Sequence, residues 1–419
     1  MRAWLVVPIA LASVLCVSVQ ARAQTLAALQ LRDALREALR ANPELIGLRR
    51  QYEAVTATIP EARSLDAPMF ETQIWGWPVT TLNPARTDMY MFMGEQQLPG
   101  RGKRAARELV ATREADLSRD QVGVRANGIL NEVKQAFTEL LLAHATEELF
   151  RQQRPVLEDT AETATVRYAS GHSGQHDTVK SVVELSRLAA DEIQWRERAR
   201  VAQIRLNVLL GREPDATIAV VPAADSDVPA SVDAERLALA RHPEIAAAAA
   251  VISREEAELV RLRGERRPDF VIGGGYMLQP GGAGAWTARG AITWPNAPCA
   301  RGGLNTRIDA QEKRLAAATA QRDVVITAVR RQVRESRVHV EAARDRIRVL
   351  ESAVIPHIEH AWEVMQIAYT SDRGDFADLL DTQRLLLTTR MEVVSARADL
   401  ARAVADLQMA MGDLPETDR

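Results

Sequence analysis

Two aspartates in the second half of the chain have the type and spacing to attract cations. Asp378 and Asp381 stand three residues apart near the start of an expected helix, where residues at this spacing lie on one face. Together they would give that face a concentrated negative charge. The alternative is that they only favour the positive N-terminal end of the helix, an effect of about 0.3–1 kcal/mol.

Other residues with possible metal chemistry are weaker candidates. Met89, Met91 and Met93 alternate along an expected strand and share one face of it, and thioethers favour Cu(I). We favour the alternative that they are apolar filling. His357 and His360 stand three apart on an expected helix, where we favour a solvated surface. The sequence therefore predicts no metal site.

Motifs for enzyme chemistry are missing from the sequence. No HExxH motif of zinc proteases occurs, and Gly171-His172-Ser173-Gly174 is one residue short of a nucleophile elbow. We therefore predict that the protein is not an enzyme and uses no cofactor.

The composition narrows the classes further. Of 419 residues, 47% are apolar, which excludes a disordered chain, and the net charge of −3 argues against a basic nucleic-acid-binding surface. Two cysteines exclude a disulfide scaffold or a cysteine-rich metal centre. Only 4% of the residues are aromatic, and the abundance of Ala, Leu, Arg and Glu favours long helices.

The N-terminus indicates export. An apolar stretch at 5–19 is followed by the small-residue cleavage signal at 21–23, so we interpret residues 1–23 as a secretory signal peptide and expect Gln24 to begin the mature chain. The alternative is an N-terminal membrane anchor, but the apolar stretch is shorter than the roughly 20 residues that a span needs. Cys16 lies inside that stretch, and we expect no lipid on it.

The chain is a tandem duplication. Asn42-Pro43-Glu44 recurs as His242-Pro243-Glu244 at an offset of 200, and Gly211 recurs as Gly412 at an offset of 201. Such constant offsets indicate two equivalent structural units. The first repeat, the linker and the second repeat are expected at residues 24–213, 214–232 and 233–419.

Each repeat changes its pattern in the same order, which predicts a mainly α fold with a small β part. Alternating segments indicate one β-hairpin in each repeat, and periodic apolar residues indicate a long helix of about 100 Å followed by a return helix. Pro155 and Pro356 are expected to kink the long helices at matching heights. The hairpins are expected at about 68–97 and 268–295, the long helices at about 103–168 and 307–369, and the return helices at about 177–210 and 378–411.

The strand segments carry a membrane signal. Their polar and apolar residues alternate over about ten residues, as the strands of an outer-membrane barrel require. They also contain Trp75, Trp77, Trp286 and Trp294, which we predict to lie near the bilayer interfaces. Four strands cannot close a barrel, so we expect subunits to share one. The alternative is a pair of soluble hairpins that cap a helical bundle.

Taken together, these features resemble the TolC-like outer-membrane efflux proteins over essentially the whole mature chain. The local marks are the Asn-Pro-Glu-Leu sequence at 42–45, where a helix begins, and the Leu-Pro-Gly sequence within 96–104, where the second strand ends and the long helix begins. The helix tips at 168–171 and 369–374 are further marks. The Met-rich strand that precedes the Leu-Pro-Gly sequence resembles most the heavy-metal branch of the family, whose members serve copper, silver or cobalt–zinc–cadmium pumps.

The resemblance implies an assembly. Three copies would form a 12-stranded barrel in the outer membrane and a helical tunnel that extends into the periplasm. The partners would be a periplasmic adaptor protein and an inner-membrane pump, expected to be of the resistance-nodulation-division type. The protein would then be a passive exit duct in a tripartite efflux system, and heavy-metal ions are one possible cargo.

The resemblance also assigns roles at the helix tips. In the family's tip motif two aspartates three residues apart face the pore, and these positions fall on Asp378 and Asp381, which would form the gate. The expected adaptor-docking tips are marked by Tyr168, Gly171, Asp177, Tyr369 and Gly374.

Two other functions stay open at this point. A type I protein secretion duct would have the same architecture. A soluble periplasmic helical scaffold would have the helices and hairpins without the membrane, and carbonate washing of membranes would separate it from a barrel protein.

Overall fold

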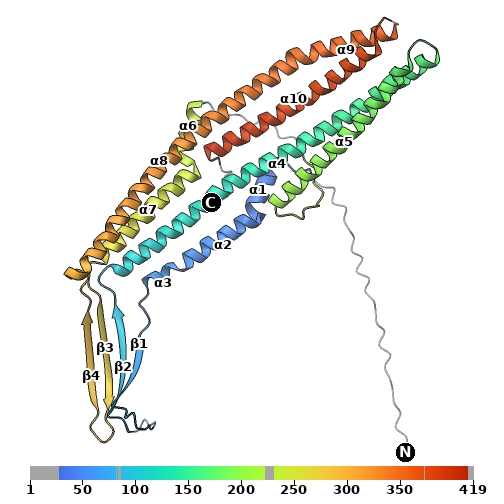
Figure 1. Cartoon of the computed structure of the whole chain (residues 1–419). Helices are drawn as coiled ribbons and strands as arrows, with labels where there is room; N and C mark the ends of the chain where they lie inside the picture. Colours follow the sequence, from blue (N-terminus) through green and yellow to red (C-terminus); the bar gives the residue numbers. More distant parts are fainter. Residues whose placement is uncertain (1–27, 82, 84–85, 222–230, 372, 414–419) are drawn as a thin grey trace, which may run out of the picture.

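The computed structural model of the chain describes residues 28–81, 83, 86–221, 231–371 and 373–413. A β-sheet forms one end of an elongated molecule, and long helices extend from it to two tips at the other end (Figure 1). The predicted signal peptide, with Cys16 and the cleavage site, lies outside the described residues, as does part of the predicted linker.

The two repeats share the order of two short-to-medium helices, a β-hairpin, a long helical arm and a return helix, which confirms the tandem duplication. The first repeat adds the short helix α3, and the long arm of the second is divided by a π-helical turn. The first repeat comprises α1 (Leu31–Ala41), α2 (Pro43–Ala57), α3 (Ile59–Arg63), β1 (Met69–Trp75), β2 (Met89–Leu98), α4 (Lys103–Ala169) and α5 (Gln175–Leu209). The second comprises α6 (Ser231–Arg241), α7 (Pro243–Gly264), β3 (Phe270–Leu278), β4 (Ala285–Ile292), α8 (Pro298–Val349), the π-helical turn η2 (Leu350–Val354), α9 (Ile355–Thr370) and α10 (Phe376–Met411).

Both predicted hairpins form, and they join into one sheet. The strand order is β1-β2-β3-β4, and every neighbouring pair is antiparallel. The central pair, β2 with β3, links the two repeats and places Phe92 opposite Tyr276. Because the repeats share this pairing, the four strands present two continuous faces rather than two separate hairpins.

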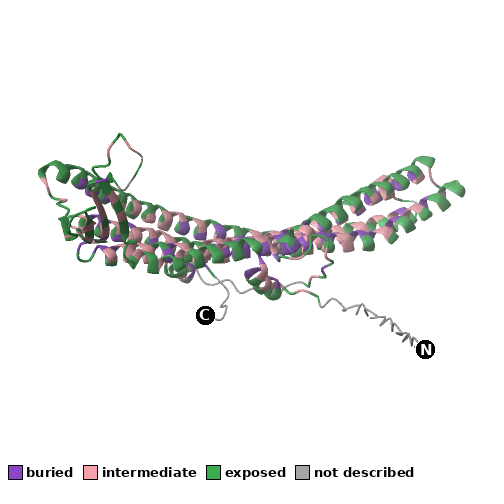
Figure 2. Ribbon diagram, turned by 90° about the horizontal axis from the view of Figure 1, so that it is seen from below, coloured by how far each residue is buried: buried purple, intermediate pink, exposed green. Residues whose placement is uncertain are grey.

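The long helices have the predicted form, with one difference between the repeats. Helix α4 contains 67 residues, so it is about 100 Å long, and it continues through Pro155 as one helix. In the second repeat the helix begins at Pro298, earlier than expected, because proline suits the first turn. It is interrupted by η2 immediately before Pro356, which confirms a local break there. The helical part bends along its length (Figure 2).

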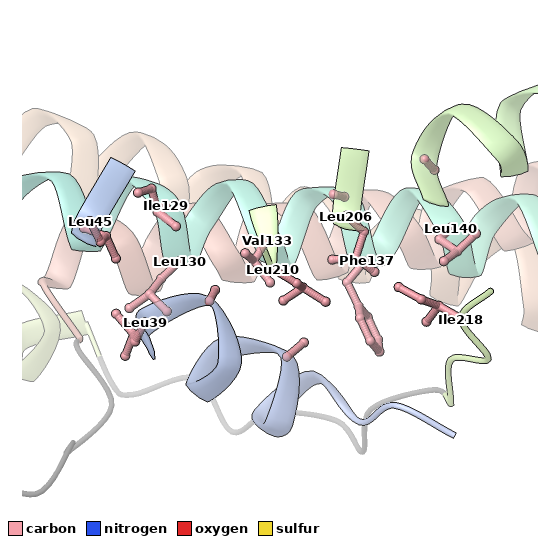
Figure 3. Close-up of a cluster of buried hydrophobic side chains, with 14 of the residues drawn as sticks. Leu39, Leu45, Ile129, Leu130, Val133, Phe137, Leu140, Leu206, Leu210 and Ile218 are labelled. Atoms are coloured by element: carbon pink, nitrogen blue, oxygen red, sulfur yellow. The ribbon is translucent and has the colours of Figure 1, made fainter. Parts of the chain in front are cut away.

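Each repeat has its own core, built around a short helix that is not among the elements expected from the sequence. In the first repeat α1 packs on the middle of α4 through Ala34 and Ala38, both fully buried. Leu130 and Phe137 of α4 fill the same cluster (Figure 3). In the second repeat α6 contributes two fully buried alanines 200 residues further on, Ala234 and Ala238. The small alanine side chains allow these short helices to approach the long ones closely.

The residues that mark the duplication form matching helix ends. Asn42 caps α2 by accepting hydrogen bonds from two backbone N–H groups of the first turn, and His242 caps α7 through Nδ1. Gly211 and Gly412 end α5 and α10 with φ of +71° and +67°. A Cβ on Gly211 would lie 2.4 Å from the Ala41 carbonyl oxygen, and one on Gly412 would lie 2.8 Å from the His242 Cα. Close packing therefore requires glycine at both positions.

Candidate functional site

The sheet has one strongly apolar face. Neighbouring strands align so that Phe92, Tyr276 and Trp286 lie side by side on it, and the rings of Tyr276 and Trp286 meet edge to face with centroids 5.2 Å apart. We call this surface the apolar face; its large side chains are Phe70, Ile74, Tyr90, Phe92, Phe270, Ile272, Tyr276, Leu278, Trp286 and Ile292. Most of them are exposed in the single chain, so this face lacks a partner within the protomer.

The opposite surface, which we call the polar face, carries the charged residues of the sheet. Arg289 forms an ion pair with Glu95 across the strands. The Gln73 side chain donates a hydrogen bond to Glu71 at 2.7 Å and accepts one from the Trp75 indole at 3.1 Å. A sheet with one apolar and one polar, hydrogen-bonded face has the chemistry of a barrel wall between lipid and water.

The four tryptophans predicted at the bilayer interfaces do not share one environment. Trp75 lies on the polar face, and Trp77 follows β1 and donates a hydrogen bond to the Thr81 carbonyl oxygen at 3.0 Å. Trp286 and Trp294 are strongly exposed, at 83% and 71%. They stand eight residues apart, one at the far end of β4 and the other just beyond its helical end. Their position at an interface stays a prediction.

A buried ion-pair cluster joins the sheet to the helices. Lys103, the first residue of α4, is 3% exposed and donates to Asp269 at 2.8 Å, with Glu265 at 3.3 Å. The other Asp269 oxygen accepts the Gly100 N–H at 2.7 Å. Burial raises the pKa of Asp269, but the hydrogen bonds from Lys103 and Gly100 outweigh it, so the net pKa is lowered. The cluster fixes the angle at which the strands meet the helices.

At the other end, the predicted gate residues are exposed on the first turns of α10. Phe376, Leu379 and Leu380 are buried against the protomer, so Asp378 and Asp381 point away from it. The N-cap of α10 is Asp375, whose Oδ1 accepts the Ala377 N–H at 3.0 Å. Asp375 therefore caps α10, and neither Asp378 nor Asp381 is needed for that role. Asp378 lies in the first turn, where the dipole also favours it.

Two of the residues predicted to mark docking tips are buried instead. Tyr369 is 4% exposed and Asp177 is 5% exposed, whereas Tyr168 and Gly171 are exposed. The Arg167 guanidinium lies over the Tyr369 ring, 4.6 Å from its centroid. Burial raises the pKa of Tyr369, and the charge of Asp177 acts in the same direction, while Arg167 opposes both. Tyr369 and Asp177 therefore help to hold the two helix tips together.

A second contact ties the tips. Arg384 of α10 forms an ion pair with Glu184 of α5, and its Nη1 lies 3.3 Å from Asp381 Oδ1. The hydrogen bond that Arg384 donates to Glu184 raises the pKa of Arg384. Sequence analysis missed Arg167 and Arg384, because their partners lie about 200 residues away and no local pattern pairs them.

The described residues show neither a metal-binding group nor a membrane-spanning helix. Across the part of the chain that the structure describes, no three His, Cys, Asp or Glu side chains are grouped to hold a metal ion. None of the helices described here combines the length and the apolarity needed to cross a membrane.

The comparison with known proteins agrees with this architecture. Residues 235–413 match the model of the family described as outer membrane efflux protein. This match covers nearly all of the second repeat. No curated protein matches the chain. Among solved structures, the outer-membrane channel OprN has 17% sequence identity and a TM-score of 0.77, with 91% of this chain and 89% of that chain covered.

Two further channels have the same fold. CusC has 14% identity and a TM-score of 0.78, with 92% of each chain covered. The outer membrane protein VceC of Vibrio cholerae has 18% identity and a TM-score of 0.75, with 91% of this chain and 96% of that chain covered. The fold of outer-membrane channels therefore extends over both repeats.

This assignment confirms the predicted class. The family match of the second repeat and the fold shared by both repeats support an outer-membrane channel for efflux, with helices that extend into the periplasm, rather than an enzyme. The matched family implies tripartite systems in which a homotrimer works with an adaptor and an inner-membrane pump. The soluble scaffold is thereby disfavoured.

Proposed function

We propose that three copies of the chain close a 12-stranded barrel that acts as the passive exit of a tripartite efflux system. The observation that carries this proposal is the open sheet: in the described chain β1 and β4 each have a strand on one side only, and the apolar face is uncovered. An open edge cannot persist in lipid, where every backbone polar group needs a partner. Pairing β4 of one copy with β1 of the next removes all edges.

The tryptophans support the orientation of the barrel. Trp286 and Trp294 are separated by about 26 Å of extended chain. A strand tilt of about 40° reduces this to about 20 Å along the barrel axis, against an apolar band of about 25 Å in such barrels. Even-numbered residues of β4 point to the apolar face, and Trp286 belongs to it. With the apolar face in lipid, the polar face lines the lumen, and Trp286 marks the outer margin of the bilayer.

The helical part would be the tunnel through which cargo arrives. Its tips expose Tyr168 and Gly171 at the first turn and leave Gly374 half-buried at the second. These accessible residues are the proposed docking points for the adaptor. The buried residues Tyr369 and Asp177 would instead help to hold the two helix tips against each other. The energy for transport would come from the pump, for which the resistance-nodulation-division type is proposed.

The gate is proposed to be a ring of Asp378 and Asp381. Two carboxylates from each of three copies make six around one axis, and such a ring attracts cations and opposes anions. Both side chains point away from the protomer body, as a pore-lining position requires. Heavy-metal cations are the proposed cargo that such a gate would favour.

The test is single-channel recording in planar bilayers. Asp378→Ala/Asp381→Ala trimers are expected to conduct with weaker cation selectivity and weaker block by multivalent cations from the periplasmic side. Asp159→Ala/Glu162→Ala is the matched control, because it removes two exposed carboxylates at the same spacing near the other tip. Equal selectivity in wild type and gate variant would overturn the gate. A wild-type protein that forms no conducting pore would overturn the function.

A further inference from the structure

The methionines of the sheet are confined to one of its faces. The register places Met69, Met89, Met91, Met93 and Met277 on the polar face. The apolar face of the described strands contains Phe, Ile, Leu, Tyr and Trp, and no methionine. Methionine packs well among apolar side chains, so it would suit the apolar face equally well. Apolar packing or contact with lipid therefore does not explain why the methionines lie only on the polar face.

Three of these side chains can meet. Met91 stands directly opposite Met277 on the neighbouring strand, where Cβ atoms are about 4.5–5.5 Å apart. Met89 is two residues further along β2 on the same face. Each side chain has three rotatable bonds, so the three sulfur atoms can turn towards one point.

The neighbours of these methionines on the sheet are small, and their charges are balanced. Met277 is flanked on the other side by Ala285, and Met93 occupies space that a side chain at Gly275 would take, since a Cβ there would lie 2.9 Å from its Cγ. The one arginine of the described strands, Arg289, is neutralised by an ion pair. No unbalanced positive charge from these strands opposes a cation.

We propose that Met89, Met91 and Met277 form a binding site for a soft monovalent cation, Cu(I) or Ag(I), on the wall of the lumen. Thioether sulfur selects such ions, whereas Na⁺ and Mg²⁺ prefer oxygen ligands. The proposal rests on the proposed function, because the polar face lines a lumen only in the closed barrel. It adds a specific contact for the cargo beyond the acidic gate.

The probe is Ag(I), added as silver nitrate in chloride-free buffer to the detergent-solubilised trimer with ¹³C-labelled methionine methyl groups. A Cys299→Ser background removes the exposed thiol that would compete for silver. We expect saturable shifts of the Met89, Met91 and Met277 methyl resonances, with none on addition of Na⁺ or Mg²⁺. The variant Met91→Leu/Met277→Leu keeps volume and should weaken silver binding more than about tenfold.

The matched control is Met365→Leu/Met391→Leu, in which both methionines belong to the helical tip cluster. It should bind silver as the parent does. Unchanged silver affinity in Met91→Leu/Met277→Leu, or shifts of equal size at Met365 and Met391, would overturn the site. Conductance of the same samples separates the two proposals: a conducting trimer without silver binding disproves the site alone, whereas a protein that forms no pore disproves the function.

Discussion

Lys103 of the first repeat and Asp269 of the second form a buried ion pair, with Nζ 2.8 Å from Oδ2, at the point where the sheet meets the long helices. Lys103 begins α4 and Asp269 immediately precedes β3, so a single contact couples a helix of one repeat to a strand of the other. This contact between the sheet and the long helices joins residues that are 166 positions apart in sequence.

Lys103→Met should destabilise the protein substantially. The substitution leaves Asp269 and Glu265 without their shared cation, and removal of one partner of a buried pair costs about 3–5 kcal/mol. The melting temperature in detergent should fall accordingly. Lys313→Met is the control, because its pair with Asp309 is exposed and contributes at most about 1 kcal/mol. Equal melting temperatures for the two variants would show that the junction pair does not stabilise the fold.

His242 should make stability depend on pH. Burial lowers its pKa, while Glu244 raises it by less, so the net pKa lies below the ordinary value. As the pH falls through about 6.5, the unfolded chain therefore takes up a proton at His242 more readily than the folded chain does. The free energy of unfolding should decrease below that pH. Melting curves measured between about pH 5 and 8 will test this.

The duplication supplies the variant for that test. His242→Asn introduces the residue that caps the equivalent helix in the first repeat, Asn42, and should keep the cap while reducing the pH dependence. His172→Asn, at an exposed tip residue, should leave the dependence unchanged. A pH dependence that persists in full in His242→Asn would assign it to other groups.

Glu184→Gln should make the channel open more easily. It removes the partner by which Arg384 holds α10 to α5, while the buried Tyr369 cluster remains. Single-channel recordings should show a higher open probability. Glu192→Gln is the matched control, since its arginine partner, Arg154, belongs to the same hairpin. If both variants behave like wild type, the contact between the tips does not restrain opening.

Much of the fold could be predicted from short-range patterns. The alternation of polar and apolar residues predicted the strands. The helical spacing of apolar residues predicted α4 to within about a residue at each end. The recurrence of Gly211 as Gly412 indicated the duplication, and the structure explains it by the close approach of each glycine to the end of the first helix of its repeat, α1 or α6.

The remainder depends on contacts that no local pattern reveals. Helices α1 and α6 are an exception, because a local signal was present and overlooked: Leu31, Ala34, Leu35, Ala38 and Leu39 of α1 have helical spacing. Ala34 and Ala38 also recur as Ala234 and Ala238 at the offset of 200. The π-helical turn before Pro356 also has no counterpart at Pro155. At the candidate site, exposure of the tip residues followed from tertiary packing, which placed Tyr369 under Arg167 rather than at the surface.

The most direct test of the trimeric barrel is disulfide trapping between β1 of one copy and β4 of the next. In a Cys299→Ser background, Thr72→Cys is combined in turn with Ala288→Cys, Gly290→Cys or Ile292→Cys, all on the face of Thr72, because the edge pairing fixes one register. After oxidation of intact outer membranes, at least one combination should give covalent dimers and trimers on non-reducing gels, and nothing larger. Monomers alone at every combination, or a ladder that continues beyond three copies, would contradict the closed barrel of three chains.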